Sequence, residues 1–325
     1  MKITNVRLEV MQTIEKSMDS LLEKYLKPIE TNWQPSDFLP DSTKDSFFEE
    51  VKELQELAQE LSYDFWAVLI GDTVTEEALP TYEAWLMDVE GVDQDGQNGW
   101  SKWVRAWTAE ENRHGDVLNK YLYLSGRVNM REMEISTQYL LNDGFDIGTG
   151  RDPYRNFVYT SFQELATNVS HRRVAAMAKK GNNPKLAKMC GNIAADEARH
   201  ANAYIEFIRQ IFELDPSEVM LAFEDMMRKK IVMPAHMLRE SGNPMGELFD
   251  HFSDAAQRLG VYTTFDYIDI LDDLLLRWDI SNINSLNDEA QRARDYLMKL
   301  PSRLRRISER IRIPEKQYEF KWLGI

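Results

Sequence analysis

Cysteine is nearly absent from this chain. Of its 325 residues only Cys190 is a cysteine, so no intramolecular disulfide can form, and we expect a reducing compartment. We expect Cys190 itself to be a small buried side chain and not a nucleophile. Glycine and proline are also scarce, at 15 and 11 residues, whereas long stretches follow the helical repeat. These absences predict an all-α protein.

Long apolar runs are missing as well. No stretch of 18 residues is apolar throughout, so we expect no membrane-spanning helix. The N-terminus has neither the charged-then-apolar layout of a secretory signal nor the Arg/Ser-rich character of an organelle transit peptide. Because the chain begins at Met1, we expect a cytoplasmic protein, with the plastid stroma as the alternative for a processed mature chain.

Basic residues are in the minority. Lys and Arg number 39 against 54 Asp and Glu, and the resulting net charge of −15 argues against a nucleic-acid-binding protein. Residues 291–321 are an exception, with ten Lys or Arg against four acids, and residues 228–230 form a second basic group. Each cluster is either a solvated helix face or a docking site for an acidic protein partner, and the sequence leaves both readings open.

The order of helical segments indicates one domain. Residues 1–40 are predicted to form a short helix followed by an extended arm, because Pro28 and Pro35 interrupt the helical repeat. No later segment has the composition of an interdomain linker, so we expect residues 1–325 to form a single all-α domain. Helices are expected at about 43–62, 74–89, 99–128, 131–141, 155–180, 184–212, 216–232, 245–258, 264–277 and 287–310.

One carboxylate–histidine motif occurs twice. Residues 110–114 read Glu-Glu-Asn-Arg-His and residues 196–200 read Asp-Glu-Ala-Arg-His. In each copy a Glu precedes a His by three residues, which places both side chains on one helix face. A further glutamate lies about 35 residues upstream of each copy: Glu164 before the second, and Glu76 or its neighbour Glu77 before the first. That distance suits the preceding helix of an antiparallel pair.

This pattern predicts a metal centre inside a ferritin-like four-helix bundle. A single copy of the motif is more often a solvated helix face, but two copies with matching upstream glutamates are hard to explain in that way. Four glutamates and two histidines from four helices form the ligand set of carboxylate-bridged di-iron or di-manganese centres. A ligand set dominated by carboxylates, with no thiolate, suits iron or manganese better than structural zinc.

Several longer stretches resemble one known family. Residues 105–116 and 194–200, which carry the two motifs, closely resemble the soluble acyl-(acyl carrier protein) desaturases of the stearoyl 9-desaturase type. The resemblance runs from about residue 60 to residue 310, and further matching segments lie at 75–82, 159–164, 225–231, 233–236 and 250–253. By this resemblance the six metal ligands, which would hold two iron ions, are Glu76, Glu111, His114, Glu164, Glu197 and His200. Spacing alone selects five of them, and the choice of Glu76 over Glu77 depends on the resemblance.

The resemblance also implies a reaction. Members of the family use dioxygen and two electrons from ferredoxin to insert a cis double bond into a saturated acyl chain on acyl carrier protein, and they are homodimers. We therefore expect a delta-9 type of desaturation on 16- or 18-carbon chains. Thr167, one turn after Glu164, is expected to help manage protons or dioxygen, although a helical Thr often only bonds to a backbone carbonyl. Asp196 is expected to support a ligand histidine, and Trp107 to join Asp196 and His114 in an electron route.

An acyl substrate requires an apolar tunnel. By alignment with the family its candidate lining residues are Trp85, Val89, Ile147, Thr149 and Phe157, each of which is also compatible with ordinary core packing. A bulky indole at Trp85 and a branched side chain at Ile147 would shorten the tunnel, so we expect a preference nearer sixteen carbons than eighteen. Lys230 and Asp250 match positions near the tunnel mouth.

Three other functions share the predicted bundle. An iron-storage protein would need only about half this length, and the helices expected after residue 215 argue against it. The radical-generating subunit of ribonucleotide reductase normally has an aspartate ligand and a nearby tyrosine, whereas all four carboxylates here are glutamates. A hydrocarbon monooxygenase shares most of the chemistry and differs in forming an alcohol. We rank the desaturase above these three.

Overall fold

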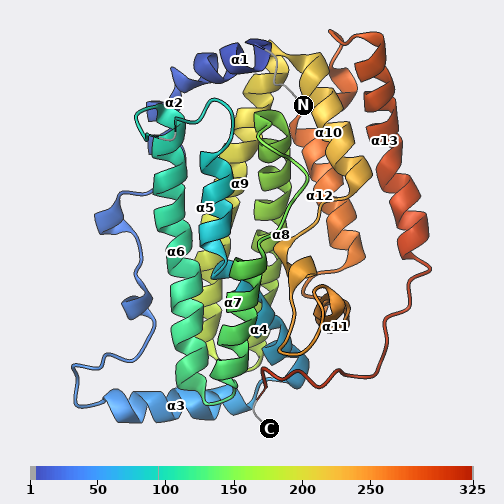
Figure 1. The fold of residues 1–325 in the computed structure, drawn as a ribbon. Helices are drawn as coiled ribbons and strands as arrows, with labels where there is room; N and C mark the ends of the chain where they lie inside the picture. Colours follow the sequence, from blue (N-terminus) through green and yellow to red (C-terminus); the bar gives the residue numbers. More distant parts are fainter. Residues whose placement is uncertain (1–4, 94, 324–325) are drawn as a thin grey trace.

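The computed structural model describes residues 5–93 and 95–323, and within them every regular secondary-structure element is a helix (Figure 1). The only β-type pairing in this part of the chain is an isolated bridge between Val128 and Leu323. The predicted all-α class is confirmed. The α-helices are α1 Asn5–Glu15, α2 Met18–Tyr25, α3 Phe47–Gln59, α4 Tyr63–Glu76, α5 Leu79–Met87, α6 Gly99–Ser125, α7 Met130–Asp143, α8 Pro153–Lys180, α9 Pro184–Leu214, α10 Pro216–Lys229, α11 Glu247–Leu259, α12 Thr264–Arg277 and α13 Asp288–Ser308.

Four of these helices, α4, α6, α8 and α9, form the predicted bundle. α8 and α9 are the longest and run antiparallel, joined by a tight turn at residues 181–183. Asn182 adopts a left-handed conformation there, and the side chain of Asn183 caps α9 by accepting a hydrogen bond from the Leu186 N–H at 3.1 Å. α7 and residues 144–152 form the longer connection between the α4–α6 pair and the α8–α9 pair.

The first bundle helix differs from the prediction of a helix over 74–89. The chain instead forms α4, which ends at Glu76, and a separate α5 that begins at Leu79 with Pro80 in its first turn. α4 is buried on almost all sides, so its residues 65–70 are uniformly apolar and carry no amphipathic repeat that would reveal a helix. Glu76 therefore occupies the last residue of a helix, beside a break in the chain.

The N-terminal segment is also more helical than predicted. Residues 5–25 form the two helices α1 and α2, and only the following arm is irregular, with the 3₁₀ turns η1 Ile29–Thr31 and η2 Pro35–Asp37. The arm packs beside α6. Buried Arg7 of α1 forms ion pairs with Asp152 and Glu218, which ties this end of the chain to the starts of α8 and α10.

The C-terminal helices α10 to α13 cover the bundle on one side, whereas α3 and α5 pack on α6. α11 packs on α4, α10 and α12 pack on α8, and α13 lies against α10 and α12. After α13 the chain returns to the bundle, where the buried indole of Trp322 donates a hydrogen bond to Ser136 of α7 at 2.7 Å. The buried apolar side chains form one contiguous cluster from Val10 to Leu323. No described helix has both the length and the apolarity of a membrane span.

Candidate metal centre

The structure brings the six predicted ligands together from four helices. Glu76 ends α4, Glu111 and His114 lie on α6, Glu164 on α8, and Glu197 and His200 on α9. Their carboxylate and imidazole atoms form two groups of four, and within each group the atoms lie within 4.8 Å of one another. The groups are Glu76, Glu111, His114 and Glu197, and Glu111, Glu164, Glu197 and His200. Because Glu111 and Glu197 belong to both, the arrangement suits two adjacent ions bridged by these two carboxylates.

Unpartnered polar atoms at the centre support this reading. Glu111 Oε1, Glu164 Oε2, Glu197 Oε1 and the Nδ1 atoms of both histidines are buried without a well-formed hydrogen bond. His114 Nδ1 lies 3.1 Å from Glu197 Oε1 and 3.3 Å from Glu111 Oε2. Buried polar atoms are normally hydrogen-bonded, so a set of them facing one point fits metal ligation. Four carboxylates would also balance the charge of two divalent cations.

The buried carboxyls and imidazoles of the cluster shift the pKa values of one another. Burial raises the pKa of Glu164 well above its usual value, and the neighbouring carboxylates of Glu111 and Glu197 raise it further. Burial acts in the same direction on Glu111, but the imidazoles of His114 and His200 outweigh it and lower the pKa of that carboxyl. Each group changes the pKa of its neighbours strongly because the groups are buried and close together. Carboxylate and imidazole ligands without thiolate suit iron or manganese.

Hydrogen bonds from outside the cluster orient most of the ligands. Thr167 Oγ1 donates to Glu197 Oε2 at 2.6 Å, besides its contacts with backbone carbonyls of its own helix. His200 Nε2 lies 2.9 Å from Glu110 Oε2. Such outer partners fix the orientation and the tautomer of a ligand. Thr167 is therefore at the centre, where the prediction put it.

Trp107 contacts other residues than those of the predicted electron route. Its buried indole donates to Glu164 Oε1 at 3.0 Å and packs near His200, whereas the indole that contacts Asp196 is a different one. The predicted grouping of Trp107 with Asp196 and His114 is therefore not what the contacts show. The reason is helical geometry, because residue 107 lies one turn before Glu111 and faces the α8 side of the bundle.

The indole that contacts Asp196 belongs to Trp33, which the sequence did not single out. Trp33 Nε1 donates to Asp196 Oδ2 at 2.8 Å, and its ring stacks on His114 with an interplanar angle of 11°. Asp196 also accepts from Arg113 at 2.9 Å and lies 3.6 Å from His114 Nε2. Trp33 lies in the irregular arm, where no periodic pattern marks it. The only feature of the sequence that could have identified Trp33 is the presence of a tryptophan in a polar, proline-containing segment.

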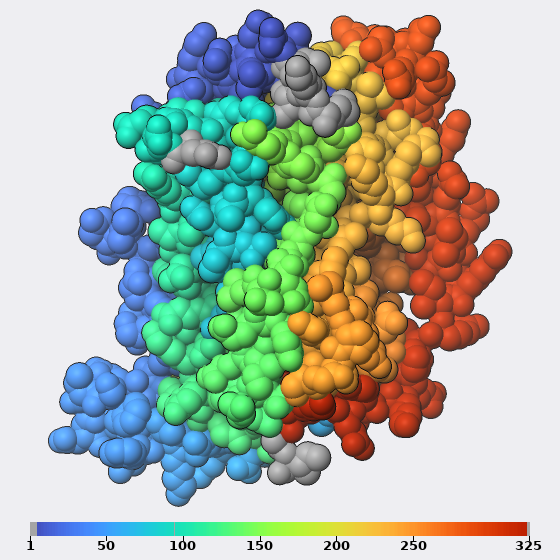
Figure 2. Space-filling view, in the orientation of Figure 1, coloured from blue at the N-terminus to red at the C-terminus, as the bar shows by residue number. Residues whose placement is uncertain are grey.

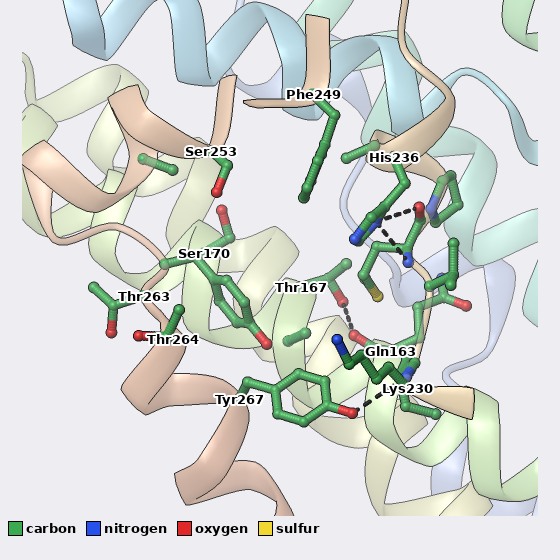
Figure 3. Close-up of a pocket in the computed structure, with 18 of the residues that line it drawn as sticks. Gln163, Thr167, Ser170, Lys230, His236, Phe249, Ser253, Thr263, Thr264 and Tyr267 are labelled. Atoms are coloured by element: carbon green, nitrogen blue, oxygen red, sulfur yellow. Dashed lines mark hydrogen bonds between the residues drawn. The ribbon is translucent and has the colours of Figure 1, made fainter. Parts of the chain in front are cut away.

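A cavity of about 800 Å³ leads from the cluster to the surface. Glu76, Glu111, Glu197 and Thr167 line its inner end, and the walls are mainly apolar. Exposed Lys230, Arg303 and Ile307 line its outer end, so the cavity opens to solvent there. Figure 3 shows Lys230, Gln163 and Tyr267 on one side of this space and His236, Phe249 and Ser253 on the other. In Figure 2 the surface is hollowed between the orange segments and the red α13.

Of the seven predicted substrate-contacting residues, only Lys230 lines the cavity. Trp85 packs edge-on against Tyr82, which lines the inner end, so the indole lies directly behind the cavity wall. Phe157 is part of the core and stacks on Trp100. Asp250 is exposed on α11, while its neighbour Phe249 lines the cavity. Val89, Ile147 and Thr149 are likewise buried away from the described cavity.

Residues that sequence reasoning missed form most of the wall. They come from α11, α12 and the loop before α12, which meet the bundle only in the folded protein. They include Phe249, Phe252, Tyr262, Tyr267 and Ile268.

Comparison with known proteins gives a consistent family assignment. The model of a family described as "Fatty acid desaturase" matches residues 6–324. The chain is 50% identical over 324 residues to the chloroplastic stearoyl-[acyl-carrier-protein] 9-desaturase 1 of Arabidopsis thaliana, covering 98% of this chain and 82% of that protein. It is also 50% identical over 323 residues to the chloroplastic stearoyl-[acyl-carrier-protein] 9-desaturase of Ricinus communis, covering 98% of this chain and 81% of that protein.

A solved structure shares the fold. The putative acyl-ACP desaturase DesA2 of Mycobacterium tuberculosis superposes with a TM-score of 0.55 at 16% identity, covering 88% of this chain and 99% of that one. At this identity the likeness concerns the arrangement of helices alone.

Proposed function

The chain belongs to the fatty acid desaturase family, and on that premise we propose that its buried centre holds two iron ions and uses dioxygen to insert a cis double bond into a saturated acyl chain on acyl carrier protein. Full-length relatives at 50% identity support a delta-9 desaturation. One observation supports this site above all: the two ligand groups that share Glu111 and Glu197 form the inner end of a long, mainly apolar cavity.

The metal is the first part of the proposal. The ligand residues would be Glu76, Glu111, His114, Glu164, Glu197 and His200. Two iron ions bound by them would activate dioxygen, the oxidant that removes hydrogen from unactivated methylenes, which side-chain acid–base chemistry cannot do. Glu111 and Glu197 would serve both ions, because they alone belong to both groups.

The cavity positions the substrate, and an acyl chain that fills it would displace water from the centre. Its walls bring an acyl chain past Thr167 and the bridging carboxylates, and this placement decides which methylenes react. Tyr82 bounds the inner end and Trp85 supports it from behind, packed also on Phe145 with ring centroids 4.7 Å apart. This rigid aromatic closure supports the predicted preference for sixteen carbons over eighteen. Thr167 would hold a proton at its Oγ1 beside Glu197.

Electrons would enter on the opposite side of the centre. Trp33, Asp196 and His114 form a continuous contact from the N-terminal arm to the ligands, and half-buried Trp33 is its outermost member. We propose that ferredoxin delivers electrons here, in place of the route through Trp107. The exposed Lys27 Nζ, 3.5 Å from Asp196 Oδ1, adds positive charge at this entrance.

The carrier protein would dock at the cavity mouth. Lys230 and Arg303 line the mouth, and α13 carries much of the basic cluster of residues 291–321. Positive charge around an apolar opening suits an acidic partner that inserts an acyl chain. We also propose a homodimer. The location stays a prediction, and the relatives named above are chloroplastic.

A reconstituted assay tests the function. Purified iron-loaded protein would receive reduced ferredoxin, oxygen and carrier protein loaded with 14-, 16- or 18-carbon chains, and products would be analysed by mass spectrometry. We expect a mono-unsaturated product, with turnover on the 16-carbon chain at least equal to that on the 18-carbon chain. A hydroxylated product would instead assign a monooxygenase. Absence of any product from iron-replete protein would contradict the proposal.

A further inference from the structure

Glu77 is the second glutamate of the pair that spacing alone could not distinguish, and the proposed mechanism gives it no role. It directly follows the last residue of α4 and belongs to neither ligand group. Its side chain instead contacts two other helices. Oε1 accepts a hydrogen bond from Asn119 Nδ2 on α6, and Oε2 lies 3.3 Å from Thr137 Oγ1 on α7, a hydroxyl that also contacts the Met133 carbonyl. The Glu77 carboxylate is therefore held outside the cluster.

The backbone beside Glu77 lies directly against α6. Gly115 is on that helix, one turn before Asn119. A Cβ built on Gly115 would lie 3.2 Å from the carbonyl carbon of Glu76 and 3.2 Å from the backbone nitrogen of Glu77. This is closer than the optimal separation of non-bonded atoms. The missing side chain of Gly115 thus lets the peptide bond between residues 76 and 77 approach α6.

These two contacts connect one proposed metal ligand to the helix that carries two others. Glu76 lies where the repeat of α4 gives way to a turn, in which the Ala78 N–H donates to the Thr75 carbonyl at 3.2 Å. At a helix end the backbone ladder does not continue on both sides, so contacts with other elements contribute more to the position of the chain. Glu111 and His114 lie on α6 itself. Contact with α6 therefore fixes Glu76 relative to these two ligands.

We propose that Glu77 is a positioning residue whose hydrogen bond to Asn119 holds the end of α4 against Gly115 and so keeps Glu76 at the metal site. The two adjacent glutamates thus have separate roles, one as a ligand and the other as an anchor. The competing explanation is a polar contact that serves only the stability of the fold. The inference rests on the proposed two-ion centre and goes beyond it by naming what places one of its ligands.

An exchange of donor and acceptor tests the hydrogen bond. Asn119→Asp removes the donor and places a second carboxylate against Glu77, so the end of α4 should move away from α6. Adding Glu77→Gln to it restores one hydrogen bond with reversed polarity, because the amide can donate to the carboxylate introduced at position 119. This double variant also keeps the wild-type net charge. Glu77→Gln alone retains an acceptor for Asn119.

Gly115→Ala tests the backbone contact. Its methyl group would meet backbone atoms that cannot rotate aside, so residues 76 and 77 should be displaced from α6. Gly191→Ala is the matched control, because a Cβ at that position of α9 would meet no atom within 4 Å. Asn192→Asp is the control for the other substitution, since the Asn192 side chain donates only within its own helix, to the Lys188 carbonyl.

The readouts are the affinity for ferrous iron, measured without oxygen by competition with a chelator, and the free energy of unfolding of the metal-free protein. For Asn119→Asp and for Gly115→Ala we expect about 10-fold weaker binding of one of the two ions. Glu77→Gln and the double variant should bind both ions nearly as tightly as the wild type. The Gly191→Ala and Asn192→Asp controls should bind both ions with unchanged affinity.

Two results would overturn the inference. One is a folded Asn119→Asp protein that is less stable but binds both ions with wild-type affinity, because the contact would then serve only the fold. The other is a double variant that binds as weakly as Asn119→Asp. If Asn119→Asp does not fold, Gly115→Ala decides, since the inference requires it to bind one ion more weakly than Gly191→Ala does. Failure of the proposed function would look different, because the wild-type protein would then bind no pair of ions.

Discussion

Trp33 and Asp196 form a hydrogen bond of 2.8 Å between residues 163 positions apart in the sequence. It joins the irregular N-terminal arm to α9 directly beside a ligand histidine. Arg113 strengthens the contact, since its guanidinium lies over the Trp33 ring at 4.3 Å from the centroid and also donates to Asp196. The arm is therefore part of the site.

Replacing Trp33 by Phe should slow electron entry without emptying the site. The variant keeps a ring against His114 but loses the hydrogen bond to Asp196, so we expect about 10-fold slower reduction by ferredoxin, the order of loss seen when an outer partner is removed. Stopped-flow measurement of the reduction rate would check this, with iron content unchanged. A small chemical reductant should restore the rate. Equal slowing with that reductant would argue against the route.

Removing a ligand should separate metal binding from folding. Glu197→Ala or His200→Ala removes one of the few groups that hold the ions, so iron content should fall sharply and turnover should be abolished. Helical circular dichroism should remain, because the buried apolar cluster is unchanged. Glu213→Ala, on the exposed surface of the same helix, is the control. Full iron in both ligand variants would refute the ligand set.

Gly71 should not tolerate a side chain. A Cβ at this position of α4 would lie 2.3 Å from Cε2 of Phe252, a ring that lines the cavity. Gly71→Ala should therefore cost about 1–3 kcal/mol in the free energy of unfolding and push the ring into the acyl path. Denaturant unfolding and KM for the 16-carbon substrate would measure the two effects.

Gly191 is the matched control for that substitution. It also lies inside a helix, α9, but a Cβ there would meet no atom within 4 Å. Gly191→Ala should stabilise the protein by up to about 1 kcal/mol, because alanine favours the helix. If the two variants had the same effect, contact with Phe252 would not be the cause.

Asp72 should make stability depend on pH. Burial raises the pKa of this cavity-lining carboxyl from its ordinary value of 3.8 to about 6. The folded protein therefore binds the proton more tightly than the unfolded chain, and this group's contribution to stability decreases as pH rises from about 4 to 6. The amide of Asn does not ionise, so Asp72→Asn removes this pH-dependent loss of stability. The variant should therefore stabilise the protein more at pH 7.5 than at pH 5.

The size of this effect is bounded. A shift of about two pKa units corresponds to at most about 3 kcal/mol, and less here because the carboxyl lines a cavity open to water. Urea unfolding of both proteins at the two pH values is the measurement. A difference between the variants that does not change with pH would show that Asp72 is ionised normally.

The sequence by itself determined the all-α class and five of the six proposed ligand positions. A Glu and a His three residues apart share a helix face whatever the helix packs against, so the two motifs could be read locally. The resemblance then distinguished Glu76 from Glu77. Neither argument required knowledge of the packing, because the helical repeat fixes the direction of side chains within one element.

Only the tertiary structure decided what surrounds these ligands. Trp33 and Phe252 come from an irregular arm and from α11, and no spacing within one element links them to the centre. The end of α4 at Glu76 was hidden for a related reason, since a helix buried on nearly all sides has no amphipathic repeat. Local periodicity thus specifies ligands, whereas long-range packing specifies their supports and the cavity.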